Sequence, residues 1–165
     1  MCNRNDSIAL NNMLRRAPEA VAYIKGDGAH PGLWGSVMFY EITEGVIVVA
    51  ELYGLPDSEG YCDSRVYAIH IHEGGTCSGD EFDSLRNVGA HYNPDGCQHP
   101  YHAGDMPPLF SARGRAYLAF LTDRFTVDEI VGRTVIVHSR PDDFTTQPSG
   151  NSGTKIACGE ILGIR

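Results

Sequence analysis

The chain has 165 residues, which is the usual size of one domain and is enough to bury a hydrophobic core without help from disulfides or metals. Its 13 basic and 21 acidic residues give a formal charge of −8, and this acidic balance argues against a nucleic acid as a partner. Hydrophobic residues make up 42% of the chain, and their runs, such as 46–50, are far too short to span a bilayer, so a membrane-spanning segment is excluded as well.

The first 18 residues are polar, contain repeated Asn and Arg, and end at Pro18. They predict an N-terminal arm, residues 1–18, that is poorly ordered or forms a short helix around 7–16, followed by one domain over 19–165. No basic segment leads into an apolar stretch, so no secretory signal is visible. We therefore expect a cytoplasmic protein or a mature form left after processing.

From Ala20 onward the apolar segments are short, rich in Val, Ile, Tyr and Phe, and bounded by Gly, Pro, Asp or Asn, which is typical of β-strands. The three residues 43–45 separate the second and third segments and predict a hairpin. The predicted strands are 20–25, 35–42, 46–54, 65–73, 113–123, 132–138 and 155–164.

Two long segments interrupt this pattern. Residues 74–112 contain Gly, Pro, Cys and His throughout with almost no strand pattern, and residues 139–153 are rich in Pro, Asp and Gly. Loops of this length in a compact domain usually carry function. Seven or eight strands with two such loops predict an all-β Greek-key sandwich or flattened barrel.

His70 and His72 lie two residues apart in a predicted strand, so both imidazoles point to one face while Ile69 and Ile71 point to the other. Both rings can therefore reach one ion. An isolated His-x-His pair is more often solvated on a protein surface, and the choice between these interpretations depends on the other histidines.

Most of the remaining histidines gather in the first long loop. Three imidazoles and one carboxylate there suit a tetrahedral zinc ion, and their spacing is His-x7-His-x2-His-x2-Asp: His91, His99, His102 and Asp105. The imidazoles left over suit copper or another borderline metal: His70, His72 and His138. The sequence thus predicts a protein with two metals. His30 stands outside both sets, as a loop histidine before Pro31.

The five cysteines, Cys2, Cys62, Cys77, Cys97 and Cys158, are too few for a disulfide framework, and their odd number leaves at least one thiol unpaired within the chain. Cys97 lies two residues before His99 and is interpreted as either an alternative soft ligand or a packed free thiol. The packed thiol is favoured.

Four segments resemble the copper/zinc superoxide dismutase family: 68–77 (AIHIHEGGTC), 89–94 (GAHYNP), 132–138 (GRTVIVH) and 150–159 (GNSGTKIACG). The match extends from about Ala20 to the end of the chain. It implies the family's eight-stranded Greek-key barrel or sandwich, in which the two long segments are a zinc loop and an electrostatic loop.

The resemblance also implies a set of site residues. The copper ligands are expected to be His70, His72, His91 and His138. The zinc ligands are expected to be His91, His99, His102 and Asp105, with His91 shared between the two ions. Asp142 matches the family's carboxylate that links a copper histidine to a zinc histidine, here His70 and His99. Cys77 and Cys158 match its intrachain disulfide.

Two positions depart from the family pattern. The usual active-site arginine, three residues before the second disulfide cysteine, is Lys155, which keeps the charge but loses the planar guanidinium fork. In the zinc loop, only Pro100 and Tyr101 separate His99 from His102, where common family members have a longer spacer.

The implied activity is disproportionation of superoxide through a Cu(II)/Cu(I) cycle beside a structural zinc, with proton transfer by His91. Because the chain carries a net charge of −8, attraction of the superoxide anion has to be local, through copper and Lys155 with help from Arg140. One alternative is a catalytically weak or inactive metal-binding relative, whose signature would be a missing copper histidine. Another is a zinc hydrolase, against which Asp105 fills the position that water would need. A homodimer is left open.

Overall fold

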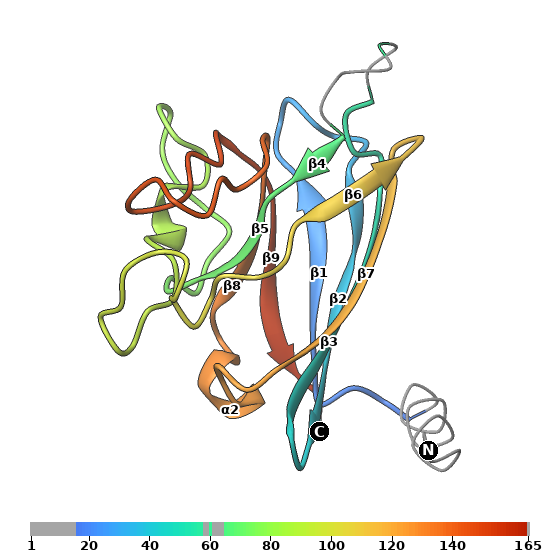
Figure 1. The fold of residues 1–165 in the computed structure, drawn as a ribbon. Helices are drawn as coiled ribbons and strands as arrows, with labels where there is room; N and C mark the ends of the chain where they lie inside the picture. Colours follow the sequence, from blue (N-terminus) through green and yellow to red (C-terminus); the bar gives the residue numbers. More distant parts are fainter. Residues whose placement is uncertain (1–15, 58–59, 61–64, 165) are drawn as a thin grey trace.

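The computed structural model describes residues 16–57, 60 and 65–164, and in these residues nine strands form one antiparallel sheet (Figure 1). Most of the N-terminal arm proposed for residues 1–18, together with Cys2 and Cys62, lies outside the described residues. The strands are β1 (Ala20–Gly26), β2 (Trp34–Ile42), β3 (Gly45–Tyr53), β4 (Val66–Tyr67), β5 (Ile69–His72), β6 (Leu109–Ala112), β7 (Arg115–Thr122), β8 (Thr134–His138) and β9 (Lys155–Gly163).

The strand order makes the sheet a nearly closed barrel. The order is β4-β6-β7-β3-β2-β1-β9-β8-β5, so the sheet begins and ends with two strands that are separated in sequence only by Ala68. β4 and β5 are the two halves of the predicted strand 65–73, which is interrupted at Ala68. The Ala68 N–H donates to Arg140 O, and the Ala68 carbonyl accepts from the N–H of His138 at the end of β8, both at 2.9 Å. Counted in this way the barrel has eight strands, and the predicted all-β barrel is confirmed.

Two local features complete the comparison with the predicted strands. The hairpin between β2 and β3 is confirmed, because Ile42 pairs with Gly45. The prediction that residues 74–112 have almost no strand pattern is wrong at the end of the segment, where β6 pairs with β7 through Ser111 and Ala116. This strand has four residues and follows two prolines, so it is too short to show an alternating pattern.

Within the described residues, two short helices occur in the connections. They are η1 (Arg86–Val88), a 3-10 helix in the first long loop, and α2 (Val127–Ile130), which follows β7. A capping box begins α2: the Thr126 N–H donates to Glu129 Oε2 at 2.7 Å. No helix in the described part of the chain is both long and apolar enough to cross a membrane.

The barrel interior holds the main hydrophobic core. It is filled by alternate residues of each strand, for example Val37 and Phe39 of β2, and the Phe39 ring meets Phe125 edge to face with 6.3 Å between ring centroids. A smaller cluster lies outside the barrel, where Leu85 and Val88 of the first long loop pack against Ile136 of β8 and Cys158 of β9. Apolar burial therefore attaches this loop to the outer face of the barrel.

A disulfide also links the first long loop to the barrel covalently. Cys77, near the start of the first long loop, is bonded to Cys158 of β9, with the two Cα atoms 5.7 Å apart, which confirms the predicted pair. The second long loop, 139–153, lies on the same side of the barrel (Figure 1). The two loops bond to each other: His99 N–H donates to Gln147 Oε1 at 3.0 Å, and Gln147 Nε2 donates to His99 O at 2.7 Å. Together they cover the outer face of β5 and β8.

Candidate metal centre

The alternation along β5 places its two histidines outside the barrel. Ile69 and Ile71 belong to the interior core, whereas His70 and His72 point to the opposite face. Both histidines are nonetheless buried, with 0% and 4% of their surface exposed, because the loops cover them. The alternative of two solvated surface histidines is therefore wrong.

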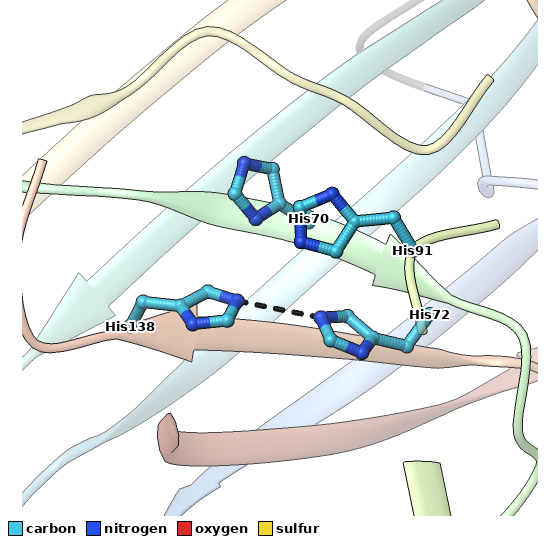
Figure 2. A group of neighbouring side chains, drawn as sticks. All are labelled: His70, His72, His91 and His138. Carbon is cyan, nitrogen blue, oxygen red and sulfur yellow. Dashed lines mark hydrogen bonds between the residues drawn. The ribbon is translucent and has the colours of Figure 1, made fainter. Parts of the chain in front are cut away.

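Four imidazoles meet at this place (Figure 2). His138 ends β8 beside a register shift in its pairing with β9, and its Nε2 lies 3.3 Å from His72 Nε2. His91 comes from the first long loop, and its ring centroid is 4.0 Å from that of His70. One nitrogen from each ring lies within 4.8 Å of the others in the set His70, His72, His91 and His138.

A second group forms around a carboxylate of the first long loop. Asp105 Oδ1 lies 2.7 Å from His91 Nδ1, and Asp105 Oδ2 lies 3.0 Å from His99 Nδ1 and 3.4 Å from His102 Nδ1. All four side chains are buried. His91 thus belongs to both groups, with Nδ1 facing Asp105 and Nε2 left for the first group.

The unsatisfied nitrogens of these groups indicate metal ions. In the described residues, the buried nitrogens without a hydrogen-bond partner include four that face these groups: His70 Nδ1, His91 Nε2, His99 Nδ1 and His102 Nδ1. A buried polar group without a partner costs about 1–3 kcal/mol, and coordination to a metal removes that cost. The donor sets fit two different ions, since four imidazoles suit copper and three imidazoles with a carboxylate suit zinc.

Asp142 connects the two groups. Its Oδ2 lies 2.8 Å from His70 Nε2, and its Oδ1 lies 2.9 Å from His99 Nε2, which leaves Nδ1 of both rings for a metal. Burial raises the pKa of Asp142, but the hydrogen bonds from His70, the Phe144 backbone and His99 outweigh burial and hold the pKa far below its ordinary value. Asp142 is therefore an anion that fixes the orientation of both rings.

A glycine makes this contact possible. Gly150 has a positive φ of 65°, and a Cβ at this position would lie 1.9 Å from Asp142 Oδ1 and 2.7 Å from His99 Nε2. Only a residue without a side chain lets the second long loop pass so close. Sequence reasoning did not single out this role, although Gly150 lies in one of the motifs.

The first long loop orients His72 in the same manner. The Gly89 carbonyl lies 2.9 Å from His72 Nδ1, so this nitrogen carries the hydrogen and Nε2 faces His138. Loop backbone also bonds to the free edge of β5: Ile71 N–H donates to Gly104 O at 2.9 Å, and Tyr92 N–H donates to Ile71 O at 2.8 Å. These bonds place His91 and Asp105 against the strand, where they form isolated bridges with His72 and His70.

Burial keeps several of these histidines neutral. It lowers the pKa of His72 to about 3 and places the pKa of His138 well below its ordinary value, and in both cases neighbouring histidines add to the effect. Burial also lowers the pKa of His70 and His102. Neutral imidazole is the form that binds a metal, so these rings are ready to do so at neutral pH.

A cavity of about 580 Å³ opens onto the first group and is lined by His72, His138 and Lys155, among others. Lys155 Nζ donates to Asp83 Oδ2 at 2.6 Å and to Leu85 O at 2.9 Å. Asp83 was not anticipated from the sequence, because it lies 72 residues from its partner and matches no motif. Arg140 is exposed, donates to Asn151 Oδ1 at 2.9 Å and is not among the described residues that line this cavity.

Cys97 is an exposed free thiol at the edge of the same cavity, so the expectation of a packed thiol is wrong. It belongs to neither ligand group in the described residues. His30 is a loop histidine whose Nδ1 lies 2.7 Å from Asp27 Oδ1. It takes no part in the metal groups found in the described chain.

Comparison with known proteins agrees with this geometry. The family model for copper/zinc superoxide dismutase matches residues 33–161. The superoxide dismutase [Cu-Zn] 2 of Aquifex aeolicus is 32% identical over 142 residues, covering 77% of this chain and 78% of that protein. The extracellular superoxide dismutase [Cu-Zn] of Oryctolagus cuniculus is 34% identical over 161 residues, covering 91% of this chain and 62% of that protein.

A solved structure shows the same fold. The Cu/Zn superoxide dismutase from Brucella abortus superposes with a TM-score of 0.71 at 23% identity, covering 86% of this chain and 99% of that one. The family model alone spans most of the sequence, including the strands and loops that carry both ligand groups. The chain belongs to the copper/zinc superoxide dismutase family.

Proposed function

We propose that this protein disproportionates superoxide to dioxygen and hydrogen peroxide, using copper held by the first ligand group and zinc held by the second. The copper ligands are His70, His72, His91 and His138. The zinc ligands are His91, His99, His102 and Asp105. The observation that carries the proposal is the sharing of His91 between an all-imidazole group and a group that contains a carboxylate.

Bound copper supplies the electron transfer, because it alternates between two oxidation states that imidazole ligands tolerate, whereas zinc has no accessible redox change. The protein supplies the proton handling and the geometry. His91 Nε2 has no hydrogen-bond partner within the protein, while Nδ1 is held on the Asp105 side. Nε2 can therefore hold a proton and pass it toward the peroxide product without the ring turning.

Attraction of the substrate depends on local charge. The chain carries a net charge of −8, which repels a small anion, and Lys155 brings a positive charge to the cavity wall beside His72 and His138. Such local patches raise association rates by roughly 10- to 1,000-fold, and superoxide dismutase is one of the systems from which that range is drawn. We assign Lys155 the role of guiding superoxide into the cavity.

The alternatives fit the site less well. A metal-binding relative without turnover would lack a copper ligand, yet all four imidazoles of the first group are present and buried. A zinc hydrolase needs an open position for water, and Asp105 fills that position in the second group. The domain boundary at residue 19, the cytoplasmic location and the homodimer stay predictions.

The test is superoxide decay measured by stopped flow on the purified full-length chain loaded with copper and zinc. A zinc-only sample of the same preparation is the matched control, and the metal content of both is measured. We expect rapid decay that requires copper. A sample that holds one copper per chain and accelerates decay no more than the zinc-only sample would instead identify a metal-binding protein without this activity.

A further inference from the structure

The positive charge on the cavity wall already has a partner. Among the described residues that line the cavity, Lys155 is the only Lys or Arg, and Glu73 is the only Asp or Glu. The Lys155 ammonium donates to Asp83 Oδ2 at 2.6 Å and to Leu85 O at 2.9 Å. Asp83 therefore offsets the charge of Lys155 before any anion enters the cavity.

Asp83 is a fixed partner for this lysine. Its Oδ1 accepts the Leu85 N–H at 3.0 Å, and its backbone carbonyl accepts the N–H groups of Asp80 at 3.0 Å and Arg86 at 3.1 Å. The hydrogen bond from Lys155 is the main reason that the pKa of Asp83 lies below its ordinary value. The side chain is thus held in place and ionised at neutral pH.

The segment that carries Asp83 is tied to the strand that carries Lys155. The disulfide joins Cys77 to Cys158, three residues beyond Lys155 on β9. Leu85 packs in the cluster that includes Cys158. Farther along the same loop, directly after η1, the Gly89 carbonyl accepts the hydrogen bond that orients His72. The ion pair therefore joins the loop segment that carries Asp83 to the strand that carries Lys155, and the disulfide and the apolar cluster already hold these two parts together.

A lysine needs such a support more than an arginine does. Its ammonium is a point charge on a flexible stem, whereas a guanidinium is a rigid fork that several acceptors can hold at once. We propose that Asp83 is a positioning residue that holds the Lys155 ammonium on the cavity wall and sets, by offsetting its charge, how strongly the cavity attracts small anions. This inference rests on the proposed function, in which superoxide is the anion.

Azide binding to the chain loaded with copper and zinc tests the inference, since azide is a small anion whose binding to copper(II) gives a charge-transfer absorption band. Asp83→Asn removes the offsetting charge. We expect Asp83→Asn to raise azide affinity by about three- to tenfold at low ionic strength. Added salt should reduce this difference in azide affinity between the variant and wild type. Glu81→Gln is the matched control, because Glu81 is an exposed carboxylate of the same loop, whereas the hydrogen bonds of the Lys155 ammonium go to Asp83 and Leu85.

Further variants separate charge from structure. Asp83→Ser keeps a side-chain acceptor for the Leu85 N–H and makes the same charge change, so it should raise the affinity as Asp83→Asn does. Asp83→Glu keeps the charge and should restore wild-type affinity, while Lys155→Met should lower the affinity. The inference is overturned if the neutral Asp83 variants match Glu81→Gln at every salt concentration, or if they bind azide more weakly than wild type.

The experiments distinguish a failure of the role of Asp83 from a failure of the proposed function. If copper-loaded wild-type protein does not accelerate superoxide decay but Asp83→Asn strengthens azide binding, the activity is wrong and the role of Asp83 stands. If decay depends on copper but azide affinity is the same in all carboxylate variants, the activity stands and the role of Asp83 is wrong.

Discussion

The two ligand groups are built from different parts of the molecule. Three of the four imidazoles in the first group lie on β5 and β8, where pairs such as His70 with Ile136 and His72 with Thr134 fix their positions. The second group comes entirely from residues 91–105, which belong to no strand. Its positions depend on two carboxylates, Asp105 and Asp142, and on a few loop hydrogen bonds.

The sheet therefore determines the positions of most copper ligands, whereas the loops determine the positions of the zinc ligands. Strand pairing arranges most of the copper group with or without a metal, because hydrogen bonds and the barrel core hold β5 and β8. The zinc group gathers a buried anion and three imidazoles in a loop, and it leaves two of its nitrogens, His99 Nδ1 and His102 Nδ1, without hydrogen bonds. Removal of the metals should therefore loosen the zinc group before the copper group.

Loss of the shared ligand should have the largest effect. His91→Ala removes one donor from each group, so we expect lower affinity for both copper and zinc and loss of superoxide disproportionation. Metal titration and stopped-flow decay measure the two effects, with His30→Ala as the control histidine outside both groups. If both affinities stayed at wild-type values, the sharing of His91 would be refuted.

Removal of the disulfide tests whether the barrel and the loop depend on each other. Cys77→Ser with Cys158→Ser opens a link between positions 81 residues apart. In the chain-entropy model, we expect the free energy of unfolding to fall by about 4.5 kcal/mol. Urea unfolding of the metal-free proteins measures this change. A difference below about 1 kcal/mol would show that the covalent link adds little to the apolar cluster around Cys158.

Loss of the carboxylate that links the groups should have a smaller effect. Asp142→Asn keeps the size of the side chain but removes the anion between His70 and His99, and we expect a loss of about 10- to 100-fold in metal affinity. Because His99 has no strand to hold it, zinc should be affected more than copper. Asp143→Asn is the control, since Asp143 bonds to Thr145 and Thr146 and not to the histidines. Equal losses for the two variants would contradict the assigned role.

The last prediction concerns pH in the metal-free protein. Burial lowers the pKa of folded His72 to about 3, whereas an unfolded histidine has a pKa of about 6.5, so the unfolded chain binds more protons between these values. Stability should therefore be highest above pH 6.5 and fall as the pH decreases toward about 3. His72→Gln should show a weaker dependence in urea unfolding at several pH values. If the free energy of unfolding changed with pH equally in both proteins, His72 would not contribute to the pH dependence of stability.

The sequence predicted the parts of the site that follow from local spacing. Alternation along 69–72 placed His70 and His72 on one face, and His91 to Asp105 were close enough in the chain to form one group. Other features depend on contacts across the fold. The pairing of Cys77 with Cys158 came from the family resemblance, because spacing alone does not select a partner among five cysteines.

The missed features have physical reasons too. The strand β6 follows two prolines and is too short for its alternation to be recognised. The contact between Asp83 and Lys155 joins a loop to a strand 72 residues later, and no local pattern encodes it. Gly150 stood out as part of a motif, but its close approach to Asp142 depends on how the second long loop folds over the first.

The backbone bonds between the first long loop and β5 have a consequence for self-association. β5 is the last strand in the sheet order, and an unpaired strand edge is a template for another chain. In this protein the loop occupies that edge, through Gly104 and Tyr92, which both bond to Ile71. The first long loop, which carries metal ligands, thus also covers the edge of the barrel at which another chain could pair. A loop that detaches would leave the metal site incomplete and would expose the unpaired backbone of β5 to edge-to-edge aggregation.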